Sequence, residues 1–218
     1  MIEMNNNINN ACKLHINGMP LSFNTSKGVL EPKYLRKTKK TFDYALSQYP
    51  RTRLMRFDLH YPDGYPVNGV TGKQITKFQE SFKAIMCAYL KRKKHNRHSQ
   101  PRFIWCREIV TSVYPHYHVA VLLNGDVFQG IGPYDDLTGE YVSGMVAKAW
   151  ASAIGITVGQ ASGAIFFPNN GTYEINKRLD TETFYNQYNQ AFYRVSYLAK
   201  LESKPFGDKG KNFHSSCK

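Results

Sequence analysis

Residues 103–123 read FIWCREIVTSVYPHYHVAVLL. Two segments of this stretch, Phe103–Val110 and His116–Leu123, carry apolar residues at both alternating sets of positions. Apolar residues on both faces are typical of central strands that are covered on both sides of a sheet. The linker between the two segments is short, which favours a hairpin over a crossover connection.

The sequence before and after this hairpin indicates helices and further strands. Apolar residues at helical spacing predict helices over about 32–49, 75–90, 141–150 and 181–201. Alternation predicts a strand over 53–61, and one or two more strands are expected within 154–167 and 172–175. Because strands and helices are mixed without a repeated βαβ spacing, the sequence indicates an α+β domain with an antiparallel central sheet flanked by helices.

The length of 218 residues allows one hydrophobic core and is short for two. We therefore expect a single domain over residues 31–203. A poorly ordered arm is expected over 1–30, because its first ten residues hold five Asn and it contains only one short predicted strand, near 14–16. Residues 204–218 are expected to form a basic tail.

The charge balance indicates a polyanionic partner. Lys and Arg number 29 against 16 Asp and Glu, a formal net charge of +13, which suits nucleic acid or an anionic membrane surface. Aromatic residues make up 14% of the chain and favour nucleic acid, because bases stack on rings. No apolar run approaches the roughly 18 residues that span a bilayer, no secretory signal is present, and the four cysteines lack C-x-x-C spacing, so we expect a cytoplasmic protein with reduced thiols.

Two basic segments are candidates for phosphate contacts. The first lies on the polar side of the helix predicted over 32–49, and the second follows the helix predicted over 75–90. The candidate nucleic-acid-binding residues are Lys33, Arg36, Lys37 and Lys40 in the first segment, and Lys91, Arg92, Lys93, Lys94 and Arg97 in the second. The alternative for the second segment is a solvated helix end, where cations are favoured by the macrodipole.

A metal site is predicted on the hairpin. His116 and His118 are two apart on a strand and therefore point to the same face. If the turn centres on Ser112, Glu108 lies directly across from His116 and joins the two imidazoles. Two histidines and a carboxylate suit Mn²⁺ or Mg²⁺ in a phosphoryl-transfer enzyme, with zinc as an alternative. The opposing interpretation is a pair of hydrogen-bonded core histidines and an exposed glutamate.

The last predicted helix carries Tyr193, Tyr197 and Lys200 along one edge. Other residues already give this helix an apolar side, so the tyrosine and lysine edge is free for another task. That task could be nucleophilic attack on phosphorus, in which a metal and a nearby lysine assist a phenol whose ordinary pKa is about 10. The alternative is that the tyrosines only pack.

Two short motifs resemble those of the HUH endonucleases: Pro115-His-Tyr-His-Val-Ala-Val-Leu-Leu and Tyr197-Leu-Ala-Lys200. Their chain order is that of replication initiators, and the paired tyrosines are similar to the two-tyrosine helix of phage rolling-circle initiators. Over residues 50–203 the chain is similar to the gene-II-like replication proteins of filamentous phages, prophages and phage satellites.

The resemblance implies a ferredoxin-like or RRM-like core and a catalytic assignment. A metal would be held by His116, His118 and Glu108, and Tyr197 would attack a DNA phosphate to give a 5′-phosphotyrosine and a free 3′-hydroxyl. Lys200 would lie beside the scissile phosphate, and Tyr193 would be a second nucleophile or only a neighbour. Asp58 or His60, in Arg56-Phe-Asp-Leu-His60, could add a ligand; the alternative is a surface pair on an edge strand.

The function implied is site-specific nicking of single-stranded or locally unwound DNA that starts rolling-circle replication of a phage-related element. The chain contains no G-x-x-x-x-G-K-[ST] motif, so unwinding and synthesis would need a host or phage helicase and polymerase. One alternative is a nickase that cuts a competing phage genome. Alternatives of other classes are a non-catalytic basic DNA- or RNA-binding regulator and a metallohydrolase of small molecules.

Overall fold

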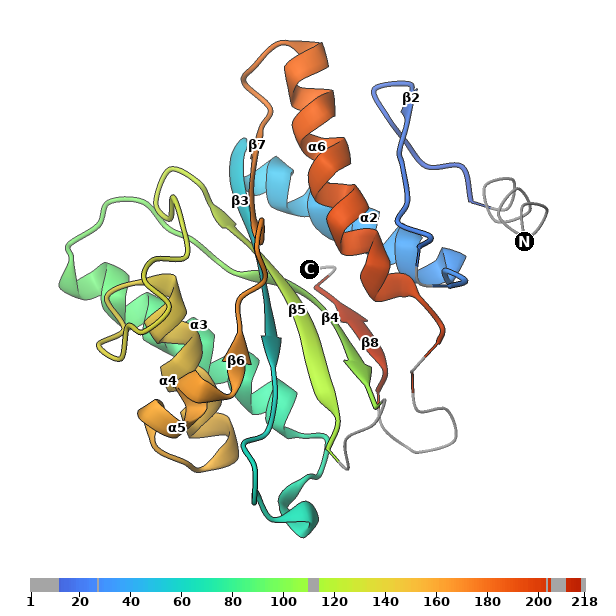
Figure 1. Ribbon diagram of the computed structural model, residues 1–218. Coiled ribbons are helices and arrows are strands. Elements are labelled where there is room, and N and C mark those ends of the chain that lie inside the picture. The colour runs from blue at the N-terminus through green and yellow to red at the C-terminus, as the bar shows by residue number, and fades with distance from the viewer. Residues whose placement is uncertain (1–11, 27, 110–113, 203, 205–210, 217–218) are drawn as a thin grey trace.

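The computed structural model describes residues 12–26, 28–109, 114–202, 204 and 211–216. An antiparallel sheet runs through the centre of the molecule (Figure 1). Its strands are β3 (Arg51–Leu59), β4 (Arg102–Glu108), β5 (His116–Asn124), β6 (Ile165–Phe166), β7 (Thr172–Asn176) and β8 (Phe213–Ser215). The spatial order is β6–β3–β5–β4–β8, and β7 pairs with the first half of β3 beside β6. The histidine strand β5 is therefore central, as predicted.

Helices cover both faces of the sheet. The helices are α2 (Pro32–Gln48), α3 (Gln74–Arg92), α4 (Val142–Ile154), α5 (Val158–Gly163) and α6 (Thr181–Ser196), with 3-10 turns at Val67–Gly69 and Tyr197–Ala199. Figure 1 shows α3 and α4 on one side of the sheet and α2 and α6 on the other. Val119 and Val121 of β5 pack in the core under α3 and α4, and Ala120 and Leu122 pack in the core under α2 and α6. The predicted α+β class, with an antiparallel sheet flanked by helices, is confirmed.

In the sheet, β5 lies between β3 and β4, which α3 connects in the chain. The chain runs β3–α3–β4–β5–α4–α5–β6–β7, and β5 pairs with both β3 and β4. A strand inserted between the two strands of a βαβ unit is the split arrangement of ferredoxin-like domains. This topology brings the last residues of β3 and β4 and the first residues of β5 together at one end of the sheet.

One expected strand is a helix. Residues 158–163 form α5, although the apolar stretch 154–167 predicted only strands. Thr157 and Gln160 form a capping box in which each side chain accepts a hydrogen bond from the other residue's backbone N–H. A short apolar stretch is compatible with a buried helix or a strand, so this cap determines the outcome.

The chain before residue 31 is more ordered than expected. Residues 12–30 contain a hairpin of β1 (His15–Ile16) and β2 (Met19–Pro20), and Cys12, Leu21 and Leu30 are buried in the core under α2 and α6. The prediction of a poorly ordered arm is therefore wrong for the described residues before 31. Their scattered apolar side chains pack against helices that lie later in the chain. Residues 1–11 lie outside the described chain.

The predicted basic tail contains a strand of the main sheet. Phe213–Ser215 forms β8 and pairs with β4, and the Phe213 ring stacks on Tyr34 of α2 at 4.3 Å between centroids. The domain therefore extends past the expected boundary at residue 203. Among the described residues, no helix combines the length and the apolar character needed to cross a membrane.

Candidate active site

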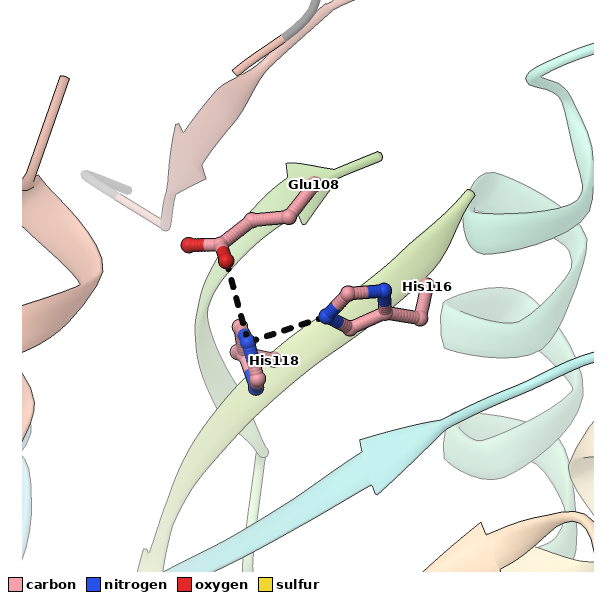
Figure 2. Close-up of side chains that lie close together, drawn as sticks. All are labelled: Glu108, His116 and His118. Carbon is pink, nitrogen blue, oxygen red and sulfur yellow. Dashed lines mark hydrogen bonds and ion pairs between the residues drawn. The ribbon is translucent and has the colours of Figure 1, made fainter. Parts of the chain in front are cut away.

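Glu108, His116 and His118 form a cluster on the sheet face that α2 and α6 cover (Figure 2). Glu108 is the cross-strand partner of His116, as the hairpin register predicts. The His118 Nε2 atom lies 3.2 Å from His116 Nε2 and 3.4 Å from Glu108 Oε2. Glu108 is only 1% exposed, so the alternative of an exposed glutamate is wrong. The turn around Ser112 lies outside the described residues.

The separations within the cluster fit a divalent ion. Ligands about 2.1 Å from an Mg²⁺ ion in octahedral geometry are roughly 3 Å from one another, close to the two distances above. All three ligand atoms lie within 4.8 Å of one another. Burial, together with the neighbouring His118 and His60, lowers the pKa of His116 to about 4, so its imidazole is neutral near pH 7 and has a lone pair for a metal. Two imidazole nitrogens and one carboxylate suit Mn²⁺, Mg²⁺ or Zn²⁺.

Asp58 orients His118 from the neighbouring strand. Its Oδ1 lies 2.8 Å from His118 Nδ1, and the two residues are cross-strand partners in the β3–β5 pair. Burial opposes ionisation of Asp58, but the Arg56 guanidinium, 2.7 Å away, and His118 hold the pKa of the carboxyl well below its usual range. A hydrogen bond from Nδ1 to this carboxylate leaves His118 Nε2 facing the cluster.

Asp58 and His60 lie beside the ligand cluster. Asp58 contacts the far nitrogen of His118, and the His60 ring stacks on His116 at 5.1 Å with planes 8° apart. Burial lowers the pKa of His60. Asp58 is 7% exposed on a strand with neighbours on both sides, so the alternative of a surface pair on an edge strand is wrong.

Tyr197 reaches the cluster through Lys200. The Lys200 Nζ atom donates to Tyr197 Oη at 2.7 Å and lies 3.0 Å from Glu108 Oε2. Burial opposes the charge of Lys200, but its contacts with Tyr197 and Glu108 raise the pKa of the ammonium group. The Tyr197 ring also meets His118 edge to face at 5.8 Å. The Glu108 carboxylate therefore contacts both His118 and Lys200, and Lys200 connects it to Tyr197.

The residues of the predicted tyrosine and lysine edge lie in α6 and in the turn that follows it. The α-helix ends at Ser196, residues Tyr197–Ala199 form a 3-10 turn, and Lys200 has an extended backbone. Residues three apart eclipse one another in a 3-10 turn, which brings Lys200 over Tyr197. Tyr193 is 43% exposed and lines a different hollow with Tyr173 and Asn189. Tyr193 therefore lines a different hollow from Tyr197.

A pocket of about 390 Å³ opens beside Tyr197 and His118. Its other lining residues are Asn24, Ser26, Arg56, Asp58, Phe166, Pro168 and Arg194. Sequence reasoning missed Asn24, Ser26, Phe166 and Arg194. The one available signal is the position of Arg194 three residues before Tyr197 in the helix predicted over 181–201.

A family assignment follows from comparison with known sequences. Residues 15–216 match the model of the YagK/YfjJ C-terminal domain. The chain belongs to this family. The YfjJ protein of Escherichia coli (strain K12) is 30% identical over 200 residues, which cover 84% of this chain and 93% of YfjJ. The YagK protein of the same strain is 31% identical over 206 residues, which cover 89% of this chain and 97% of YagK.

Both relatives are named as uncharacterized proteins. No solved structure matches the chain. The resemblance to HUH endonucleases stays a prediction for this YagK/YfjJ domain.

The first basic segment of the YagK/YfjJ domain lies next to the cluster. The start of α2 is joined to the segment Tyr197–Lys200, called the tyrosine segment below. Glu31 N donates a hydrogen bond to Ala199 O, and Leu30 forms an isolated β-bridge with Lys200. Its four candidates, Lys33, Arg36, Lys37 and Lys40, are exposed, and none of them forms an ion pair with the residues that the structure describes.

The second basic segment lies at the opposite end of the sheet. His98 O and Ser99 Oγ bind Asn124, the last residue of β5. Eight residues at roughly 3.4 Å each separate Asn124 from His116, about 27 Å along the strand. All five residues are exposed. Arg92 and Lys93 pair with Glu140, and Arg97 pairs with Asp126. The structure therefore separates these residues from the candidate active site.

Proposed function

We propose that this protein is a divalent-metal-dependent endonuclease that nicks single-stranded DNA through Tyr197. The observation that carries the proposal is the position of Lys200 Nζ, 2.7 Å from the Tyr197 hydroxyl and 3.0 Å from Glu108 of the ligand cluster. A nucleophile, a cation and a ligand set beside one open pocket are the parts that phosphoryl transfer requires.

The proposed step is a transesterification. Tyr197 Oη attacks phosphorus, the bond between phosphorus and the 3′-oxygen breaks, and the products are a 5′-phosphotyrosine and a free 3′-hydroxyl. The phenol proton goes to solvent and the leaving oxygen takes a proton from solvent. The Lys200 ammonium group stabilises the developing charge on the phenol oxygen. A metal held by Glu108, His116 and His118 would polarise the phosphate.

DNA is the proposed substrate because exposed cations lie close to the nucleophile. The net charge is +13, and the start of α2 presents Lys33, Arg36, Lys37 and Lys40 beside the tyrosine segment. We propose that the nick starts rolling-circle replication of a phage-related element in the bacterial cytoplasm, with helicase and polymerase supplied by the host or a phage. Rejoining of the cut strand through Tyr197 would support this role over cutting of a competing genome.

The direct test is capture of the covalent product. The purified protein is incubated with labelled random-sequence single-stranded DNA and Mn²⁺ and run on a denaturing protein gel. We expect a labelled band at protein mass that is lost in Tyr197→Phe and with excess chelator. Tyr193→Phe, which removes a hydroxyl outside the pocket, is the matched control and keeps the band.

The absence of a band from wild-type protein that binds both Mn²⁺ and DNA would contradict the proposal. The chain would then be interpreted as a basic nucleic-acid-binding regulator. In that case His116→Ala would change stability while salt-sensitive DNA binding persisted.

A further inference from the structure

We propose that Phe166 and Arg194 form a subsite for one nucleotide of the DNA strand, with the base stacked on Phe166 and a flanking phosphate on Arg194. This inference rests on the proposed function, because it assigns the substrate contacts next to Tyr197. Both side chains line the pocket that Tyr197 and His118 share, and the proposed chemical step uses neither of them.

Phe166 stands in one row with the ligand cluster. Cross-strand pairing joins His118 to Asp58 and Asp58 to Phe166, so the three side chains point to the same face of the sheet. Two strand spacings place Phe166 roughly 10 Å from His118. The Phe166 ring is 57% exposed and lies next to Asp58, which is buried. A nucleobase is a planar partner for such a ring.

Arg194 supplies an uncompensated positive charge to the same pocket. Its neighbours Arg56 and Lys200 are paired with Asp58 and Glu108. In the part of the chain that the structure describes, no carboxylate pairs with Arg194, and its buried Nε atom has no hydrogen-bond partner. A guanidinium group that no carboxylate neutralises is suited to a phosphate.

The remaining wall suits a nucleotide in size and polarity. The pocket holds about 390 Å³, and Asn24 and Ser26 line it with amide and hydroxyl groups. Asp58 is the acidic residue among those that line the pocket and would repel a phosphate. Its carboxylate is already bound by Arg56 and His118. An aromatic face and a free cation beside a nucleophile therefore indicate a nucleotide of the cleaved strand.

The test measures binding without cleavage. Fluorescein-labelled oligo(dT) of twelve nucleotides is titrated by anisotropy in EDTA, so that no metal-dependent reaction occurs. We expect Phe166→Ala to raise Kd at least fivefold, the lower end of the range for loss of one base–aromatic stack. Phe166→Trp should bind as wild type, whereas Phe166→Leu should resemble Phe166→Ala, because only an aromatic ring stacks.

A twelve-unit abasic backbone separates the two roles. On this probe the effect of Phe166→Ala should vanish, because no base remains to stack. Arg194→Gln should weaken both probes and lower the salt slope of binding by about 0.7, the value for one phosphate contact on a single strand. Leu179→Ala and Arg178→Gln, in the turn before α6 at the far end of the sheet, are the matched controls and should bind both probes as wild type.

Wild-type binding by Phe166→Ala and Arg194→Gln would overturn the subsite, as would an undiminished effect of Phe166→Ala on the abasic probe. These outcomes are independent of the proposed function, which depends on the covalent band and not on binding in EDTA. A lost covalent band with the expected binding changes would instead overturn the nicking chemistry and leave a nucleotide-binding pocket.

Discussion

Asp58 determines which nitrogen of His118 is available to a metal. Its carboxylate lies 2.8 Å from Nδ1 and is itself fixed by Arg56. The resemblance to HUH endonucleases suggested Asp58 or His60 as a further direct ligand. The role of Asp58 beside the cluster depends on the pairing of β3 with β5, which joins residues about 60 apart in the chain and cannot be read from local spacing.

We predict that Asp58→Asn weakens Mn²⁺ binding by about tenfold to a hundredfold, the usual effect of losing a carboxylate that orients a metal-binding histidine. Isothermal titration of Mn²⁺ measures the change. Asp135→Asn, on an exposed loop, is the control and should bind as wild type. Equal affinity in Asp58→Asn and wild type would show that Asp58 does not orient His118.

Residue-level predictions succeeded where one local rule was sufficient. The strand period of two and a short turn placed Glu108 opposite His116. The spacing of three placed Lys200 against Tyr197. Phe166 was missed because its position follows from a two-residue pairing with Asp58, and a strand of that length has no alternation to detect.

At the scale of elements, the edge strand β8 joins two layers. Phe213 faces α2, and His214 packs against Trp105 on the opposite face at 5.7 Å. Burial and the nearby Lys211, Lys83 and Lys37 lower the pKa of His214 from its ordinary value to about 4. The folded protein therefore disfavours the protonated ring.

The lowered pKa of His214 makes the free energy of unfolding depend on pH in the acidic range. Between pH 6.5 and 4 the unfolded chain binds a proton at His214 that the folded chain does not, so the free energy of unfolding falls as the pH falls through this window. We predict that His214→Phe, which keeps an aromatic ring on Trp105, loses less stability than wild type between pH 7 and pH 5. Urea denaturation at the two pH values measures the difference.

His15→Phe is the control for this measurement. His15 is exposed on the β1–β2 hairpin, and its replacement should leave the loss at low pH as in wild type. An identical loss in His214→Phe and wild type would show that His214 does not contribute to the acid sensitivity.

Element boundaries were predictable for long periodic segments and unpredictable for short ones. Pro32 and Pro50 bracket α2, so its limits follow from the sequence. The α5 helix and β8 have six and three residues, and each is determined by contacts rather than by period. The end of α6 was missed because Tyr197–Ala199 continues the apolar pattern while the hydrogen bonding changes.

At the scale of the molecule, charge is distributed unequally between the two ends of the sheet. Lys33, Arg36, Lys37 and Lys40 of α2 are exposed and form no ion pair within the described part of the chain, and α2 begins beside the tyrosine segment. The cations at and after the end of α3 are partly paired with Glu140 and Asp126. The sequence identified both segments as basic, but only the tertiary arrangement separates them. The same holds for the chain before residue 31, where Asn24 N binds Ser196 Oγ across 172 positions of sequence.

We predict that the double variant Lys33→Gln with Lys37→Gln lowers the salt slope of single-stranded DNA binding by about 1.4, the value for two phosphate contacts. The matched double variant, Lys91→Gln with Lys94→Gln, removes the same charge at the far end and should leave the slope as in wild type. Anisotropy titrations of oligo(dT) at several salt concentrations measure both. Equal slopes for the two double variants would show that long-range charge, and not the position of α2, governs binding.

The convergence of Tyr197 and Lys200 on Glu108 also sets an order of events during synthesis of the chain. The hairpin that carries Glu108, His116 and His118 is translated well before the tyrosine segment. A domain generally folds as a unit, so a nascent chain that has reached β5 carries the three residues of the cluster while it still lacks the proposed nucleophile. Under the proposed function, a nascent or truncated chain that ends before Tyr197 would therefore leave DNA intact, and nicking would require almost the whole sequence.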